Sequence, residues 1–173
     1  MSEEKVPLEV CKELVSGEIA TRGLIVGLLA KPLLERYGDE VLEIIRNANY
    51  EAGKVAGGNA ARALGKHDLA AIADLFGRST ATKVFNPEIV EESGDRVVIH
   101  WRSCPIPSLM SNLKEKGFPD DYLDFLCPIL QLFDNGFVEG FNPNLTAMTP
   151  PQTGETGLNK KEDFCTIIIS TKK

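Results

Sequence analysis

The sequence contains no long hydrophobic run free of charges. Its most apolar early stretch, residues 23–30 (GLIVGLLA), lies between Arg22 and Lys31 and is far too short to span a bilayer. The first ten residues (MSEEKVPLEV) also lack the basic segment and apolar core of a secretory signal. We therefore expect a cytoplasmic protein with no membrane partner.

The sequence also lacks an excess of positive charge. It has 19 basic and 25 acidic residues, a net charge of −6 and a pI near 5.0, and the two signs are mixed along the chain. Proteins that bind phosphate backbones usually present a basic face. The composition therefore argues against a nucleic-acid partner and leaves a small-molecule substrate or ligand, with assembly into a homo-oligomer left open.

Several catalytic and metal-binding signatures are missing. The only two histidines are His67 and His100, which excludes a multi-histidine metal centre. There is no phosphate-binding glycine loop, no HExxH and no GxSxG. No two of the four cysteines lie within four residues of each other, so the spacing of a structural zinc site is missing. In a reducing compartment we expect these cysteines to be thiols, ligands or catalytic groups rather than disulfides.

The remaining composition is that of an ordinary globular protein, with 43% hydrophobic and 25% charged residues. A chain of 173 residues can bury a core without a disulfide or a metal. No repeat or linker divides it, so we expect one domain over residues 1–173. Helical patterns come first and strands then alternate with helices. This order indicates an α+β fold, with N-terminal helices packed with a small, mostly antiparallel sheet and two further helices.

The first half has helical periodicity. A first helix is expected to begin at Pro7, and a second to span about 17–37 with a kink or restart at Pro32. Gly38 and Asp39 then give a stop signal and a start signal. In the next helix, apolar residues at a spacing of four and three predict a core-facing side. Its members are Val41, Ile45, Ala48, Ala52 and Val55.

The second half changes to a period of two. Residues 96–102 alternate as a strand does. The pattern places Val97, Ile99 and Trp101 on one face and Val98, His100 and Arg102 on the other. Shorter strands are predicted over 82–85, 89–92, 144–148 and 164–170, helices over 67–77, 108–116 and 120–133, and a long loop over 149–161.

Cys104 is the first candidate for chemistry. If the strand geometry of residues 96–102 continues, His100, Arg102 and Cys104 point to one face. A histidine and an arginine near a thiol lower its pKa toward a reactive thiolate. His100 and Cys104 are about 13 Å apart along an extended strand, too far for a direct hydrogen bond, and a bend at the Cys104-Pro105 step could shorten this distance. A small buried hydrophobe that ends a strand is an equally good explanation.

Cys127 and Asp134 form the second candidate. On a helix, Cys127, Gln131 and Asp134 share one face, and Pro128 predicts a kink or a helix start. An aspartate at the C-terminal end of a helix is unfavourable against the helix dipole, which indicates a role for Asp134 beyond capping. Core packing is the alternative for Cys127, and a simple turn is the alternative for residues 134–136.

Residues 139–143 (EGFNP) predict a binding loop with an irregular backbone. Glu139 supplies a carboxylate and Asn142 an amide, and a residue before proline is held extended. An ordinary turn explains the same stretch.

Cys165 alternates with Ile167 and Ile169 on the last predicted strand. These apolar neighbours favour a packing role for Cys165, unless Cys104 and Cys127 lie beside it. Three converging thiols could hold zinc or an iron–sulfur cluster.

Taken together, several segments resemble the L-2-amino-thiazoline-4-carboxylic acid hydrolase-like family. They are LLERYGDEVLEIIRNANYEAGKVAG, WRSCP, LCPILQLFDNGFVEGFNPNL and KKEDFCTIII, which together span most of the chain. Two positions depart from the family pattern: Lys161-Glu162 stands where a glycine-aspartate pair often precedes the last cysteine, and Gln131 stands where a cysteine is frequent.

The resemblance implies a hydrolase that opens a small cyclic amidine carrying a carboxylate, at a ring C–N or C–S bond, to give a carbamoyl amino acid. It implies that Cys104 is the nucleophile or a substrate-facing thiol, and that Asp134 is the base or the partner of the amidinium cation. Asn142 would orient the substrate, and Arg102 or His100 would meet its carboxylate. The full set of expected substrate-binding residues is His100, Arg102, Cys127, Glu139, Asn142 and Cys165. Such a site works by positioning and preorganised charge and needs no cofactor.

Two other classes stay open. One is a non-catalytic small-molecule-binding or sensory domain, because the helical lead and small sheet also resemble vinyl-reductase-like and haem-nitric-oxide-like ligand-binding domains. The other is a cysteine-ligated metal or cluster protein.

Overall fold

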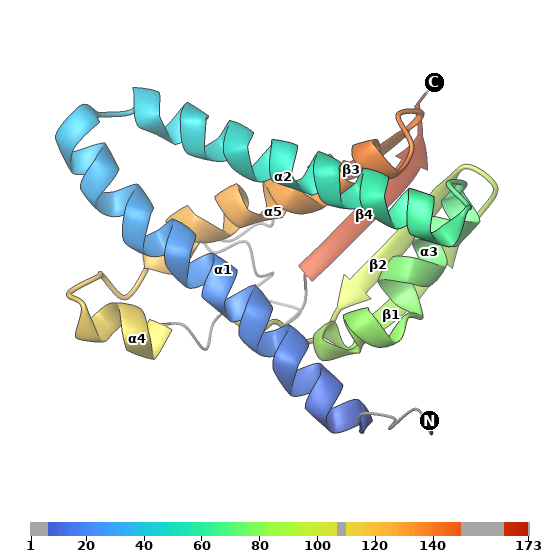
Figure 1. Ribbon diagram of the computed structural model, residues 1–173, viewed down its shortest axis with the longest axis horizontal. Coiled ribbons are helices and arrows are strands. Elements are labelled where there is room, and N and C mark those ends of the chain that lie inside the picture. The colour runs from blue at the N-terminus through green and yellow to red at the C-terminus, as the bar shows by residue number, and fades with distance from the viewer. Residues whose placement is uncertain (1–6, 107–109, 150–164, 173) are drawn as a thin grey trace, which may run out of the picture.

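The computed structural model describes residues 7–106, 110–149 and 165–172, without the side chains of residues 110 and 111. The elements in chain order are α1 (Leu8–Tyr37), α2 (Glu40–Leu64), α3 (Leu69–Gly77), the 3-10 helix η1 (Thr80–Phe85), β1 (Pro87–Glu92), β2 (Arg96–Trp101), α4 (Met110–Glu115), α5 (Tyr122–Phe141), β3 (Leu145–Met148) and β4 (Cys165–Thr171). In Figure 1, α2 lies along α5, the sheet is at one end of this pair, and α1 crosses in front. The predicted α+β class is confirmed.

Helix α1 is a single helix of 30 residues, although the sequence predicted two segments. Pro32 lies inside it on the exposed side, where water can satisfy the carbonyl group that loses its helical partner. The predicted helix boundary near residue 17 and the restart at Pro32 are therefore wrong. The stop at Gly38 is confirmed, since its φ of 75° lies in the left-handed region that glycine favours.

Helix α2 buries a different face from the one predicted. Ala48, Ala52 and Val55 are exposed, and Val55 retains 64% of its accessible surface. The buried residues of α2 are instead Asn49, Gly53 and Gly57. The predicted core-facing stripe is therefore wrong at its three C-terminal members.

Four glycines let the backbones of α2 and α5 touch. They are Gly53 and Gly57 on α2 and Gly136 and Gly140 on α5. A Cβ atom added at any of these four positions would lie 1.9–2.1 Å from a backbone oxygen of the other helix. We call this contact the glycine interface. It explains why the face of α2 that lacks large side chains is the buried one.

Helix α5 continues further than the sequence predicted. It passes through Pro128 and runs to Phe141. The predicted helix end near residue 133, the turn at residues 134–136 and the loop conformation of residues 139–141 are therefore wrong. Gly136 contributes to the glycine interface rather than to a turn, because close helix packing needs a residue without a side chain there.

The sheet has four antiparallel strands in the order β1-β2-β4-β3. Ile99 of β2 pairs with Ile167 of β4, and Trp101 pairs with Cys165. The buried face of the sheet packs on α3 and α5, and the core contains Val97, Ile99, Ile167, Ile169, Ile72, Phe76, Val138 and Phe141. The predicted face of β2 is confirmed, but the strand predicted over 82–85 is wrong because these residues belong to η1.

A second apolar cluster joins α4 and α5 to α1. Leu113, Leu126 and Leu130 are its most buried members, and Leu24 of α1 packs against it. The predicted loop 150–161 and the pair Lys161-Glu162 lie outside the described residues. In the described part of the chain, no helix is long and apolar enough to cross a membrane.

Candidate active site

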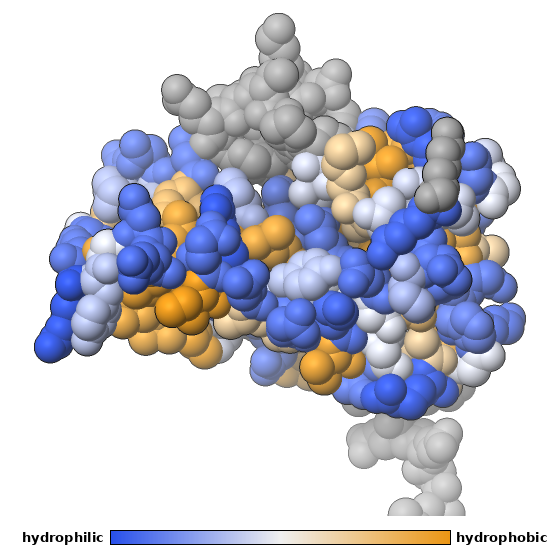
Figure 2. Space-filling view, turned by 90° about the horizontal axis from the view of Figure 1, so that it is seen from above, coloured by the Kyte–Doolittle hydropathy of each residue, from blue (hydrophilic) through white to orange (hydrophobic). Residues whose placement is uncertain are grey.

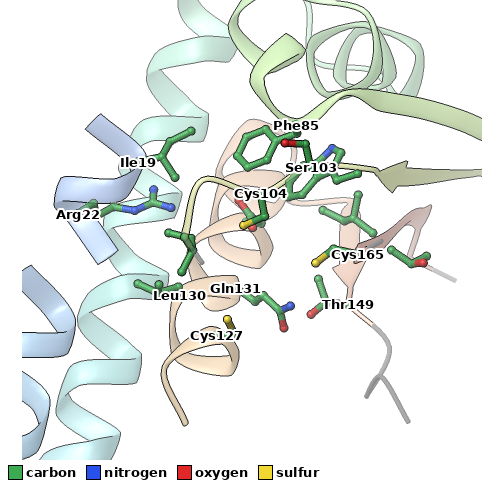
Figure 3. A pocket seen from close by; sticks show the side chains of 15 residues that line it. Ile19, Arg22, Phe85, Ser103, Cys104, Cys127, Leu130, Gln131, Thr149 and Cys165 are labelled. Carbon is green, nitrogen blue, oxygen red and sulfur yellow. The ribbon is translucent and has the colours of Figure 1, made fainter. Parts of the chain in front are cut away.

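A small cavity lies between α1, α5 and the adjoining ends of β2 and β4 (Figure 3). Its volume is about 70 Å³, well below the roughly 300–1,000 Å³ of pockets for drug-sized ligands. The polar and thiol side chains on its wall are Arg22, Ser103, Cys104, Cys127, Gln131, Asp134, Thr149, Cys165 and Thr166. The cavity therefore suits a molecule of few heavy atoms with polar groups.

The fold brings the three distant cysteines to this cavity by three different routes. Strand β2 ends at Trp101, and the chain then turns so that Cys104 reaches the cavity. Cys165 begins β4 opposite Trp101, and Cys127 comes from the first half of α5. Figure 3 shows their sulfur atoms on different sides of the cavity. Cys104, Cys127 and Cys165 therefore border one space.

Asp134 is the carboxyl group of the cavity. It lies on the same face of α5 as Cys127 and Gln131. Burial raises its pKa from 3.8 to about 6, and the positive charge of Arg22 opposes this rise. An acid with a pKa near neutrality can both accept and return a proton at physiological pH.

Burial favours the protonated form of two of the cavity thiols, Cys104 and Cys127. Burial raises the pKa of Cys104 to about 12, with smaller opposing contributions from a backbone hydrogen bond at Ile106 and from Arg22. Burial also raises the pKa of Cys127 to about 12. A low dielectric environment disfavours the thiolate. The electrostatics therefore do not supply the activated thiolate that the sequence interpretation expected at Cys104.

Sequence reasoning missed Arg22, which enters the cavity from α1. Its guanidinium carbon lies 4.1 Å from the centre of the Phe133 ring, a cation–π distance. Its Nε atom is buried and has no hydrogen-bond partner among the described residues. A charged residue at the edge of the apolar run 23–30 was the available signal, because an arginine on a mainly apolar helix face often has a buried partner or ligand.

Trp101 is the second missed residue. The sequence pattern only placed it on one face of the strand with Val97 and Ile99, and it also borders the cavity. Its ring stacks on Phe85 at 4.5 Å and on Phe76 at 5.9 Å between centroids. Its buried Nε1 has no hydrogen-bond partner among the described residues.

His100 and Arg102 do not line the cavity. His100 pairs with Thr166 across the sheet, and alternation turns its side chain to the face opposite Trp101. The Arg102 Nε atom donates to a carboxylate oxygen of Glu88 at 2.9 Å. The regular strand ends at Trp101, so the alternation that would place both residues on one face with Cys104 does not extend to Cys104.

Glu139 and Asn142 also lie away from the cavity. Glu139 pairs with Lys54 and Lys172, each at 3.3 Å, and a hydrogen bond with Tyr50 is the largest cause of its lowered pKa. The Asn142 side chain donates to the His67 carbonyl oxygen at 2.6 Å. Both residues therefore secure the end of α5, and the structure does not bring them to the site.

The thiols do not form a recognisable metal centre within residues 7–106, 110–149 and 165–172. No group of three or more histidine, cysteine, aspartate or glutamate side chains in these ranges is arranged to hold a metal ion. The three cysteines share the cavity, but the raised thiol pKa values of Cys104 and Cys127 also oppose the deprotonation that metal ligation requires.

A small cavity with a buried acid, an arginine and uncharged thiols is typical of a protein that acts on or binds a small polar molecule. The family model of L-2-amino-thiazoline-4-carboxylic acid hydrolase matches residues 19–168. This match covers most of the chain and includes every residue of the cavity wall. The protein belongs to this family. No curated protein matches the chain.

Proposed function

We propose that the protein is a cofactor-free hydrolase that opens a small cyclic amidine resembling 2-amino-thiazoline-4-carboxylate. The observation that carries this proposal is Asp134. Its half-buried carboxyl group borders the cavity, and its pKa is raised to about 6. The family membership supplies the reaction class, and the small cavity favours a small molecule over a large one.

Asp134 is suited to two tasks in this reaction. Its carboxylate can accept hydrogen bonds from the planar amidinium group, a charge-assisted pairing. It can also take a proton from a water molecule that attacks the amidine carbon. The tetrahedral intermediate then collapses with cleavage of the ring C–N or C–S bond. The carboxyl group returns the proton to the departing nitrogen or sulfur, and the water oxygen becomes the carbonyl oxygen of the carbamoyl product.

Cys104 serves in this mechanism as a substrate-facing thiol. With a pKa of about 12, its thiolate is a very small fraction at neutral pH, so water activated by Asp134 is the better nucleophile. A neutral thiol still offers a weak donor and a polarisable contact to a sulfur-containing ring.

The test is a turnover assay with 2-amino-thiazoline-4-carboxylate that measures release of the carbamoyl product. Asp134→Asn should abolish turnover while the protein stays folded. In the wild type, kcat/KM should fall as the pH drops below about 6, because protonated Asp134 cannot act as a base. Cys11→Ala is the matched control, since Cys11 does not border the cavity, and it should leave activity unchanged.

Cys104→Ser separates the two roles of the thiol. Partial activity is expected for a substrate-facing thiol, whereas complete loss together with a covalent adduct in the wild type would establish a nucleophile. If the wild type binds the thiazoline carboxylate and never turns it over, the proposed hydrolase activity is wrong and the protein is a binding or sensory domain.

A further inference from the structure

Arg22 presents an unused hydrogen-bonding group inside the cavity. Its Nε atom is buried and has no partner among the described residues, although a guanidinium group donates up to five hydrogen bonds. Arg22 forms no ion pair within the described ranges, because no carboxylate oxygen there lies within 4.0 Å of its side-chain nitrogen atoms. Buried donors without partners are rare in folded proteins and need a specific explanation.

The position of Arg22 is fixed by contacts that leave its N–H groups available. Its guanidinium group lies over the Phe133 ring at 4.1 Å, which holds the plane without using a hydrogen bond. Figure 3 shows the side chain extending from α1 toward Cys104, on the side of the cavity away from Cys165 and Thr149. An arginine held in this way is preorganised for an incoming anion.

Arg22 and Asp134 place opposite charges in the same cavity. The charge of Arg22 lowers the pKa of Asp134, although burial outweighs this effect. The two groups therefore interact electrostatically without forming an ion pair. A ligand that carries both an anionic and a cationic group could contact both residues at once.

We propose that Arg22 binds the carboxylate of the substrate and so restricts the enzyme to small zwitterionic amidines. This inference rests on the proposed function and assigns Arg22 the task that the sequence interpretation gave to His100 or Arg102. The carboxylate of the ligand faces Arg22, and its amidinium group faces Asp134. Arginine suits this role because its planar fork matches the two oxygens of a carboxylate.

The Nε1 atom of Trp101, which has no hydrogen-bond partner among the described residues, also supports a carboxylate-bearing ligand. Arg22 and Trp101 both supply hydrogen-bond donors that lack acceptors among the described residues. A carboxylate-bearing ligand would supply acceptors to both donors. A neutral apolar ring would leave both donors unpaired.

The experiment compares two probes, 2-amino-thiazoline-4-carboxylate and 2-amino-thiazoline without the carboxylate. Binding is measured by calorimetry with the wild type and with Arg22→Gln, and turnover is measured in parallel. The wild type should prefer the carboxylate probe by about 10- to 100-fold, the range expected from one charge-assisted pairing. Arg22→Gln should remove this preference and leave the affinity for the uncarboxylated probe unchanged.

Arg36→Gln is the matched control, because Arg36 lies exposed near the end of the same helix, and it should retain the preference. Arg22→Lys should recover part of it. An equal loss of affinity for both probes, or no loss for either, overturns the role of Arg22. Selective binding without turnover refutes only the hydrolase activity, and failure of the wild type to bind either probe refutes both proposals.

Discussion

The two faces of α5 differ in how tightly they are packed. One face carries Gly136 and Gly140, whose backbone lies directly against α2 and leaves no room for a methyl group. The opposite face carries Cys127, Gln131 and Asp134 and borders a cavity of about 70 Å³. One helix therefore uses backbone contact for stability on one side and keeps space and a buried acid for a ligand on the other.

The difference in packing between the two faces of α5 affects the stability of the fold. At the glycine interface the packing atoms belong to the backbone and cannot move aside separately. On the cavity side, the structure accepts a half-buried carboxyl group with a raised pKa and two buried donors without partners among the described residues. Such features destabilise a fold and are typical of functional sites.

The largest expected effect comes from filling the glycine interface. Gly57→Ala would place a Cβ atom 1.9 Å from the Phe137 carbonyl oxygen, so the two helices must separate. We expect a loss of about 3 kcal/mol or more in the free energy of unfolding, at or beyond the usual upper limit for overpacking. Denaturant unfolding measures it.

Gly58→Ala is the neighbouring control. A Cβ atom there would lie 3.5 Å from the Gly140 carbonyl oxygen, which is an ordinary contact. Replacing a helical glycine by alanine should then stabilise the protein by roughly 0.5–1 kcal/mol. A similar loss for both variants would show that helix separation is not the cause.

Removing the buried acid should have a somewhat smaller effect of opposite sign. The native state raises the pKa of Asp134 from 3.8 to about 6, so it binds this proton more tightly than the unfolded chain does. Burial of the ionised form therefore destabilises the fold above about pH 6, and this penalty disappears as the pH falls toward 3.8.

Asp134→Asn should consequently raise the free energy of unfolding at pH 8 by on the order of 3 kcal/mol, and by little at pH 4. Thermal unfolding at both pH values checks this. Asp120→Asn changes an exposed ion pair with Lys114 and should alter stability by less than about 1 kcal/mol at either pH. A destabilised Asp134→Asn protein at pH 8 would contradict the comparison of the two faces.

The smallest expected effect concerns the attachment of α5 to α1. The buried Tyr122 hydroxyl donates to the Gly27 carbonyl oxygen at 2.8 Å, close to the segment that carries Arg22. Tyr122→Phe should lower the free energy of unfolding by about 1 kcal/mol. Because the ring is retained, the preference for the carboxylate probe should survive, and the calorimetric assay measures it.

Much of the fold could be predicted from local signals. Gly38 ends α1 with a positive φ, and the Asp68 side chain caps α3 by accepting from the Ala71 backbone N–H at 2.8 Å. Alternation along β2 correctly grouped Val97, Ile99 and Trp101 on one face. These features depend on a few adjacent residues, so a single sequence contains the information.

The faces of α2 could not be predicted in the same way. Pattern rules assign the core to the more apolar side, which carries Val55. Here a backbone contact at Gly53 and Gly57 outweighs side-chain hydrophobicity. The need for it arises only when α5 is placed against α2, and α5 is distant in the sequence.

The residues of the candidate site also divide into those that the sequence could predict and those that it could not. Family resemblance pointed to Cys104 and Asp134, and both border the cavity; their catalytic roles remain predictions. Extending β2 by a few residues led to His100 and Arg102, since a small error in strand length reverses which side chains share a face. Arg22 requires knowledge of where α1 crosses α5, which no local pattern contains.

The central position of β4 has a consequence for how the protein is made. Residues 165–171 pair with β2 on one side and with β3 on the other. A nascent chain that still lacks these residues therefore cannot join β3 to β2. Until this segment has been synthesised, the backbone N–H and C=O groups on one edge of β2 are unpaired and can bind other chains. We therefore expect the protein to depend on chaperones during its synthesis more strongly than the stability of the folded protein would suggest.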